Sequence, residues 1–283
     1  MSASSPKQLQ QTISKAYYNA CMAELHALKP GNVHIFADGH GMTVQDFMVS
    51  AEVTCDVMSQ PNLTLGERIL ASVQATQNAV SINTNLGIVL LCAPMIQAAY
   101  LQNENSLEAN LRLVLAQTTI DDSEQVFEAI RLAKPAGLGV SLQHDVHQKP
   151  TVNLQAAMQA AQQKDNIAAQ YGNNFDAIFR LGLPAYQAAL QRLNPSWSTT
   201  ALYLTLLAKL ADSHVARKFG AATAAIIQTE AQDHLTKFNL CDNPKLYLSP
   251  LLKWDNALKL AGLNPGTSAD LTVAVLLADL LQQ

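Results

Sequence analysis

The sequence contains few charged and few aromatic residues. Only 14% of its 283 residues are charged and 6% are aromatic, whereas 49% are hydrophobic. The 18 Lys and Arg against 22 Asp and Glu leave a net charge of −4, so the chain lacks the basic excess of nucleic-acid-binding proteins. An anionic ligand must therefore be met by locally placed cations and backbone amides. We expect small-molecule partners and no nucleic acid.

Paired cysteines, a signal peptide and a membrane-length apolar run are also absent. The cysteines are far apart in apolar stretches and form no CxxC pair, which indicates reduced core thiols. The N-terminal residues are polar, and the longest apolar run, residues 86–101, is too short to span a bilayer. We expect a cytoplasmic protein without a membrane partner, and the sequence leaves a homo-oligomer open. The four cysteines are Cys21, Cys55, Cys92 and Cys241.

Apolar residues recur with helical spacing along nearly the whole chain, and the alternation typical of strands is hard to find. The sequence therefore predicts one all-α domain, residues 1–283, of about ten to twelve helices. Thr43, Thr64, Asp212 and Ser268 are candidate helix starts. The expected helices span residues 6–28, 43–59, 64–81, 85–102, 106–118, 122–134, 153–170, 171–192, 197–210, 213–231, 247–261 and 266–282.

The longest stretch without helical periodicity is residues 134–153, "KPAGLGVSLQHDVHQKPTVN". Its length and turn residues fit a domain linker, and its Gly-Leu-Gly and His-Asp-Val-His fit a surface or active-site loop equally well. Helices resume on both sides without a change in composition, which favours a single domain.

Four polar stretches interrupt the apolar helices, and the first lies at residues 29–34. Pro30 disfavours helical geometry at Lys29, so the preceding helix should end there. Lys29 offers a point charge for phosphate, and Gly31 lets the backbone approach a ligand. Asn32 and His34 follow. The same residues also fit a plain helix stop with a solvated lysine.

The second polar stretch, residues 83–87, places three amide or hydroxyl side chains before a wholly apolar helix. The start of a helix carries free N–H groups and partial positive charge, which together bind anions. Asn83, Thr84, Asn85 and Gly87 are therefore candidate phosphate ligands. Ordinary N-capping is the alternative, although it needs only one such residue.

The third polar stretch, residues 212–218, joins an acid, an imidazole and two cations within three helical turns. Asp212 follows an apolar helix, and His214 lies three and four residues before Arg217 and Lys218. Such a group can bind a metal–phosphate complex and transfer protons. A solvated helix start is the alternative.

The fourth polar stretch, "NPGTSADL", leads into the last helix. Gly266 and Ser268 at a helix start suit phosphate, and Asp270 could hold Mg²⁺. A capping box would account for the same residues without a ligand.

These four stretches, in this order, resemble the triphosphoribosyl-dephospho-CoA synthase family, which makes the prosthetic group of citrate lyase and malonate decarboxylase. The matching pieces are "ELHALKPGNVH", "FMVSAE", "NTNLG", "DSHVARKFG" and "NPGTSADL", and the resemblance covers nearly the whole chain. It implies an all-α fold and a reaction in which ATP loses adenine. The 5-triphosphoribosyl group passes to the ribose 2-hydroxyl of dephospho-CoA.

The resemblance and the chemistry of this reaction together assign candidate roles. A carboxylate can stabilise the oxocarbenium-like state at the ribose, a base must take the acceptor proton, and the triphosphate needs cations and Mg²⁺. The catalytic candidates are Glu24, Lys29, Asp212 and His214. The nucleotide or phosphate candidates are Lys29, Gly31, Asn32, His34, Asn83, Thr84, Asn85, Gly87, Arg217, Lys218, Gly266 and Ser268. The candidate Mg²⁺ ligands are Asp212 and Asp270.

The chain departs from the synthases at two positions. The synthases typically read NTHKG where this chain has "NTNLG", so Asn85 and Leu86 replace a histidine and a lysine. A Gly-Gly after Arg217 is likewise replaced by Lys218-Phe219. The pattern is closer to a divergent branch of archaea and methyl-group-oxidising bacteria, which implies the same fold and a nucleotide-like pocket whose acceptor need not be dephospho-CoA. Loss of the histidine and lysine favours a smaller or less anionic acceptor.

Two further function classes stay open at this point. One is a transferase or hydrolase acting on another phosphorylated intermediate of a one-carbon carrier cofactor. The other is a non-catalytic, nucleotide-binding helical protein. Acids or cations in the first, third and fourth stretches favour an enzyme that uses ATP with Mg²⁺ on dephospho-CoA or another acceptor.

Overall fold

The computed structural model describes residues 5–139 and 143–283, and within these ranges every regular element is a helix. The all-α prediction is confirmed. The helices are α1 (Pro6–Leu25), α2 (Val44–Met58), α3 (Leu65–Val80), α4 (Leu86–Ala99), α5 (Leu107–Ala116), α6 (Ile120–Ala133), α7 (Leu154–Ala161), α8 (Asn166–Asn173), the π-helix η1 (Ala177–Gly182), α9 (Leu183–Leu190), α10 (Pro195–Lys209), α11 (Ser213–Phe219), α12 (Ala221–Asn239), the 3₁₀-helix η2 (Pro244–Tyr247), α13 (Leu248–Leu260) and α14 (Gly266–Leu280).

The described part of the chain contains fourteen α-helices, so the expected ten to twelve was too low. One missed break precedes α8, where Asp165 accepts hydrogen bonds from the Ile167 and Ala168 N–H groups and starts a new helix. The other lies between α11 and α12, where Gly220 has a φ of 89° that interrupts the helical path. Both breaks fall inside continuous apolar periodicity, which is why periodicity alone did not reveal them.

Side-chain caps explain most of the helix starts. Thr43 and Thr64 each form a capping box with the third residue of the helix, and Asp212 accepts from the Val215 N–H at 3.0 Å, as expected. Ser268 does not cap a helix, so it is not a start signal. The last helix begins at Gly266, after Pro265, as the expected range 266–282 had it.

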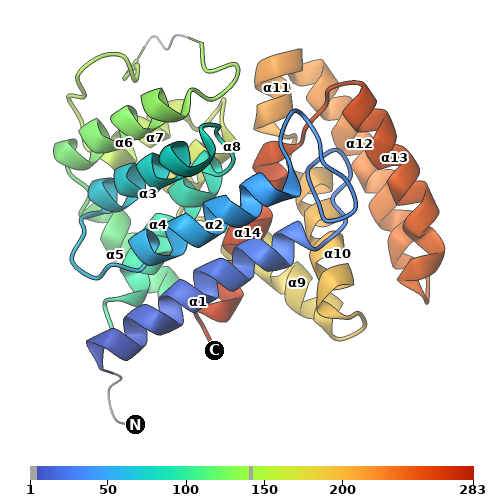
Figure 1. Cartoon of the computed structure of the whole chain (residues 1–283), viewed down its shortest axis with the longest axis horizontal. Helices are drawn as coiled ribbons and strands as arrows, with labels where there is room; N and C mark the ends of the chain where they lie inside the picture. Colours follow the sequence, from blue (N-terminus) through green and yellow to red (C-terminus); the bar gives the residue numbers. More distant parts are fainter. Residues whose placement is uncertain (1–4, 140–142) are drawn as a thin grey trace.

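The helices surround a central one, α14 (Figure 1). Helices α1, α2, α3 and α6 pack in succession against one another, and α14 packs against α1, α4, α10 and α11. Helices α11, α12 and α13 stand to the right of this group in Figure 1. Because α14 contacts both groups, its first turn lies where they meet.

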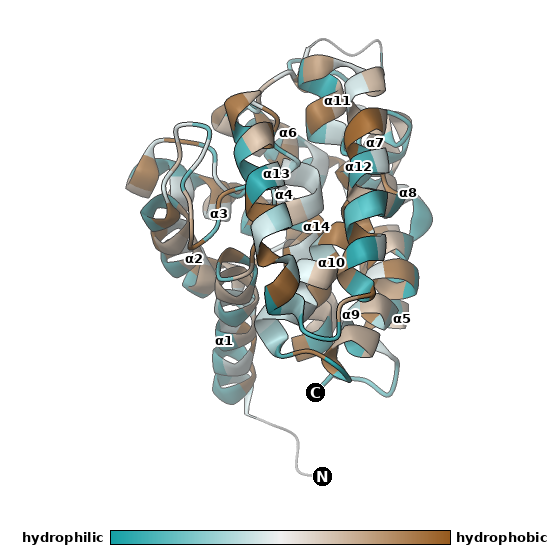
Figure 2. Ribbon diagram, turned by 90° about the vertical axis from the view of Figure 1, so that its right-hand side faces the viewer, coloured by the Kyte–Doolittle hydropathy of each residue, from teal (hydrophilic) through white to brown (hydrophobic). Residues whose placement is uncertain are grey.

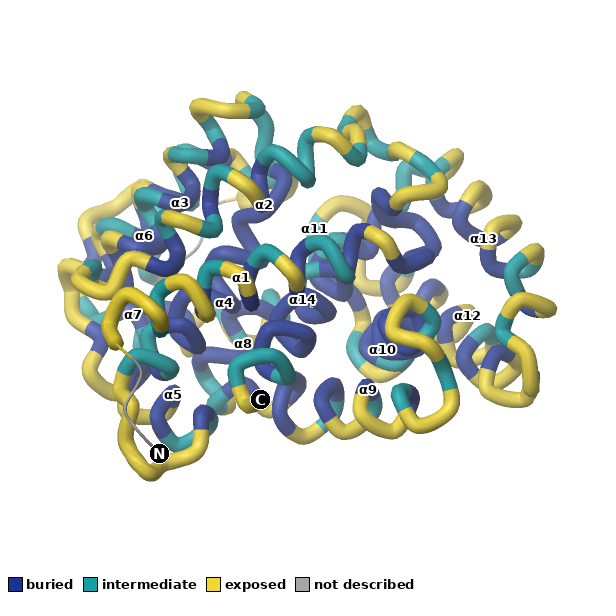
Figure 3. The backbone as a smooth tube through the Cα atoms, turned by 60° about the horizontal axis from the view of Figure 1, so that its bottom comes forward, coloured by how far each residue is buried: buried dark blue, intermediate teal, exposed yellow. Residues whose placement is uncertain are grey.

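The buried side chains form two hydrophobic clusters. The larger draws on α1–α9, most of α14, and Leu202 and Leu206 of α10. The smaller draws on α10–α13 with Leu28, Ala189 and Ala269. Helices α4, α10 and α14 are the most continuously buried stretches (Figure 3), whereas α12 carries hydrophilic residues along its outer face (Figure 2). That the chain forms a single domain stays a prediction, to which the sharing of α14 by both clusters gives support.

The described helices include none that is both long and apolar enough to cross a bilayer. All four cysteines are free, with Cys21 and Cys92 buried.

Candidate functional site

A cavity of about 320 Å³ opens where the two hydrophobic clusters meet. Side chains from all four polar stretches line it, although Asn32 and Asp270 are 238 residues apart in the sequence. From the predicted set the wall contains Glu24, Asn32, Asn83, Thr84, Asn85, Gly87, His214, Arg217, Gly266 and Asp270. The expected convergence is therefore observed for part of each stretch. Lys29, Gly31, His34, Asp212, Lys218 and Ser268 are absent from this wall.

The N-terminus of α4 faces the cavity through the second polar stretch. Asn83 caps the helix by accepting from the Leu86 N–H at 3.2 Å, and the Thr84 hydroxyl is held at 2.6 Å by Ser50. Asn85 occupies the N-cap position without a side-chain cap bond, and its side chain, only 5% exposed, makes no hydrogen bond with the described residues. This unpartnered amide in the cavity wall is free to bind a ligand.

Asp270 on α14 faces this helix start. A Cβ added at Gly87 would lie 2.6 Å from the Asp270 carboxyl carbon, so only glycine leaves room for the carboxylate there. Asp270 is partly buried, lines the cavity and has no hydrogen bond or ion pair with any described residue. Burial and the negative charges of Glu24 and Asp212 raise the pKa of its carboxyl well above the ordinary value.

Glu24 presents its carboxylate to the cavity while Lys29 supports it from behind. The Lys29 ammonium is fully buried, pairs with Glu24, and donates to the Asn32 Oδ1 at 3.2 Å and the Val33 carbonyl at 2.6 Å. Burial lowers the pKa of Lys29 and raises that of Glu24, and their mutual attraction opposes both shifts. Lys29 has these three partners within the protein and does not line the cavity. It therefore stabilises Glu24 and residues 29–34 rather than contacting a ligand.

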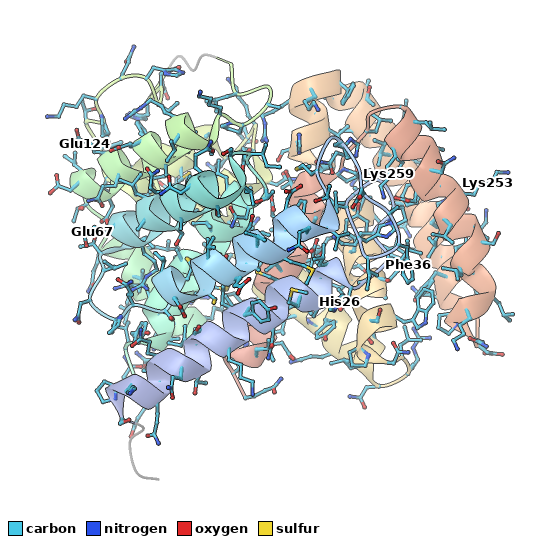
Figure 4. All side chains as sticks on the ribbon, viewed as in Figure 1. His26, Phe36, Glu67, Glu124, Lys253 and Lys259 are labelled. Carbon is cyan, nitrogen blue, oxygen red and sulfur yellow. The ribbon has the colours of Figure 1, made fainter. Side chains whose placement is uncertain are left out.

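The rest of the first polar stretch, residues 29–34, is bound to α13. Asp255 accepts from the Gly31 N–H at 2.8 Å, lies 3.3 Å from the buried His34 Nε2 and pairs with Lys259 at 3.1 Å. In Figure 4 Lys259 lies beside this loop, whereas Lys253 on the same helix projects away from it. Burial lowers the pKa of His34. These contacts form a structural cluster next to the cavity, and His34 does not line the cavity.

Asp212 joins α11 to α14. One of its carboxylate oxygens accepts from the Val215 N–H, and the other accepts from the Ser268 N–H at 2.8 Å and hydroxyl at 2.9 Å. The side chain is fully buried, which raises the pKa of its carboxyl. Because both oxygens are engaged, Asp212 and Ser268 fix the start of α14, and so the position of Asp270, from outside the cavity.

The α11 helix brings His214 and Arg217 to the cavity. The His214 ring packs over Gly266, where a Cβ would meet its Nδ1 at 2.5 Å, and Arg217 pairs with Asp165 at the start of α8. Lys218 is exposed and lies 5.6 Å from the Phe219 ring. Burial and the cations Arg217 and Lys218 lower the pKa of His214 to about 4, so its imidazole is neutral at physiological pH.

This lowered pKa predicts acid lability. Since unfolded His214 binds a proton near pH 6.5 and folded His214 only near pH 4, the free energy of unfolding should fall as the pH drops from 6.5 to 4. His214→Gln should reduce this fall, as measured by urea denaturation across that range. The exposed His26→Gln is the control. An identical pH profile for His214→Gln and the unmutated protein would contradict the assigned environment.

The donor set restricts how a metal ion could bind. Within residues 5–139 and 143–283 no three His, Cys, Asp or Glu side chains are grouped closely enough to hold an ion by themselves. Mg²⁺ commonly uses one or two carboxylates together with substrate phosphates. The unpartnered Asp270 fits this mode, and the engaged oxygens of Asp212 fit it poorly.

Sequence reasoning missed a large part of the wall. Eight residues of the stretch left open as linker or loop line the cavity, namely Pro135, Ala136, Leu138, Gly139 and residues 143–146. Residues 140–142 lie outside the described part. The apolar wall from α6, α7 and α8 gave no sequence signal, because cavity-lining and core residues have the same composition. Asp165 did carry a signal, since it is a good N-cap residue before "NIAAQ".

Comparisons with known proteins agree with this arrangement. The family model CitG, described as ATP:dephospho-CoA triphosphoribosyl transferase, matches residues 10–283. A solved structure named "putative triphosphoribosyl-dephospho-coA synthase from Archaeoglobus fulgidus" has the same fold, with a TM-score of 0.61 and 24% identity over 83% of this chain and 97% of that one. None of the curated proteins compared matches the chain. Since the family match spans nearly all of the sequence and the fold agrees, the chain belongs to the ATP:dephospho-CoA triphosphoribosyl transferase family.

Proposed function

We propose that this protein transfers the triphosphoribosyl group of ATP to a hydroxyl of dephospho-CoA or a related acceptor, inside the cavity between the two clusters. One observation carries the assignment to this cavity. The unpartnered carboxylate of Asp270 lies against the start of α4, so that a negative side chain and a helix N-terminus face the same space. A metal–triphosphate complex satisfies both, because its phosphates suit the helix start and its cation suits the carboxylate.

The triphosphate binds along the start of α4. The Gly87 and Ile88 N–H groups have no acceptor within the helix, and the Asn85 amide beside them is unpartnered. Arg217 and Lys164, both in the cavity wall, supply cationic side chains. Asp270 would hold Mg²⁺, which would offset phosphate charge that two cations alone leave uncompensated.

Glu24 accepts the proton of the acceptor hydroxyl. The hydroxyl oxygen forms a bond to the ribose anomeric carbon as the bond from that carbon to adenine breaks, and adenine leaves with the electron pair and takes up a proton. Lys29 favours the ionised form of Glu24 for this role, because its ammonium opposes the rise in the pKa of Glu24 that burial causes. The carboxylates of Glu24 and Asp270 also favour the positive charge that develops on the ribose.

Adenine release distinguishes this reaction from other uses of ATP. We expect free adenine to accumulate when the protein is incubated with ATP, Mg²⁺ and dephospho-CoA, together with a product heavier by one triphosphoribosyl group. Chromatography and mass spectrometry measure the two products. Formation of ADP or phosphate would instead indicate another phosphoryl reaction. Adenine release only with a different acceptor would show that Asn85 and Leu86 mark a change of acceptor.

A further inference from the structure

The cavity has an apolar half that none of the roles above uses. We call it the apolar lobe and define it by Leu90 of α4, Phe127 and Ile130 of α6, Met158 and Ala161 of α7, and Ile167 of α8. These helices pack on one another, α6 on α7, α7 on α8 and α4 on α8. Four of the six side chains are buried, whereas Ile130 and Ala161 are half-buried.

The walls of the apolar lobe are hydrocarbon, apart from the thioether of Met158. A charged group would lose its hydration there without compensation, and so would a group that needs many hydrogen bonds. The triphosphate is therefore expected at the polar lining, near Asn85 and Asp270, which adjoins the lobe at Ile167. The neighbouring Leu86, which stands where the synthases carry a lysine, extends the apolar surface toward that half.

The leaving adenine is also a poor occupant. A purine carries hydrogen-bonding nitrogens on most of its edges, and the base must gain a proton as it leaves. None of the six lobe side chains can donate one. An acyclic pantetheine arm spaces its two amides, hydroxyl and thiol along a flexible chain, and the branched alkyl and methylene segments between them gain from burial against such a wall.

We infer that the apolar lobe binds the uncharged pantetheine arm of a CoA-type acceptor. The inference rests on the proposed function, and it specifies which part of the acceptor is recognised. The arm occupies the space between α6, α7 and α8, and the nucleotide end of the acceptor then points toward Glu24 and Asp270.

The test measures binding of pantetheine, the arm alone, to the full chain by NMR saturation transfer. Ala161→Leu fills the lobe and should weaken this binding by about 10-fold or more, because added methyl groups compete with the ligand for the same volume. Ala160→Leu, at an exposed position that also lines the cavity, is a second variant less sensitive to folding. Ala225→Leu on the exposed face of α12 is the matched control and should bind as the unmutated protein does.

Adenosine serves as the second probe, and its binding should be unaffected by Ala161→Leu. The inference is overturned if the unmutated protein does not bind pantetheine, if both lobe variants bind it normally, or if they weaken adenosine instead. Adenine release is followed separately. A protein that binds pantetheine in the lobe but releases no adenine would disprove the proposed function alone, and turnover without lobe-dependent pantetheine binding would disprove this inference alone.

Discussion

Asp270→Asn is expected to lower kcat by about 10²–10³-fold, the usual effect of removing one charge-stabilising group from an active site. Asparagine has nearly the same shape, so it fits the space left by Gly87. It cannot hold Mg²⁺ as a carboxylate does, and it contributes no negative charge near the ribose. The loss should appear in steady-state adenine release at saturating ATP and Mg²⁺.

The same substitution should make the protein more stable. The pKa of Asp270 is raised in the folded state, so its charge opposes folding at every pH above the unfolded value of 3.8, and the penalty grows as the pH rises. Asparagine removes this penalty, and the gain in unfolding free energy should be larger at pH 7 than at pH 4. Active-site groups commonly trade stability for activity in this way.

Urea denaturation at the two pH values measures this second effect. Asp279→Asn, on the same helix near its end, is the control and should change neither activity nor the pH dependence of stability. If Asp270→Asn were inactive because it is poorly folded, its stability would fall instead. Full activity in a stable Asp270→Asn variant would remove this residue from the site.

Lys29→Met should lower the free energy of unfolding by about 3–5 kcal/mol, the cost of leaving one partner of a buried ion pair without the other. Methionine keeps the length of the side chain and removes the ammonium that Glu24, Asn32 and Val33 share. Chemical denaturation monitored by circular dichroism measures the change. The exposed Lys253→Met is the matched control, with an expected change within about 0.5 kcal/mol.

The double variant Glu24→Gln with Lys29→Met separates the two roles considered for Lys29. If the lysine supports Glu24, removing both charges should recover much of the lost stability, because no unpaired buried charge remains. If the lysine bound phosphate, Lys29→Met would leave stability nearly unchanged and weaken ATP binding, which calorimetric titration would detect.

The sequence was sufficient for the fold and for the location of the site. Apolar periodicity predicted the helices. Polar residues at predicted helix ends indicated the cavity, because a helix start carries unpaired N–H groups in any fold. The sequence did not reveal the role of each side chain. Lys29 and Asp212 have the residue types of ligands, yet their partners, Glu24 and Ser268, come from packing that spacing does not specify.

The apolar lobe could not be anticipated for a different reason. Its six side chains have the composition and spacing of a helical core, and only the packing of α4, α6, α7 and α8 leaves a space between them. The break between α7 and α8 was missed although Asp165 signals it, since the two helices continue one apolar pattern. Cavities of this kind depend on helix angles and side-chain volumes that a single sequence does not reveal.

The most direct test of the central claim is a crystal structure of the protein with Mg²⁺ and an ATP analogue whose bond to adenine resists cleavage. We predict that the triphosphate lies at the start of α4, beside Asn85 and Arg217, and that the metal ion contacts Asp270. A nucleotide bound outside this cavity, or a metal ion held by Asp212 with Asp270 left free, would contradict the account.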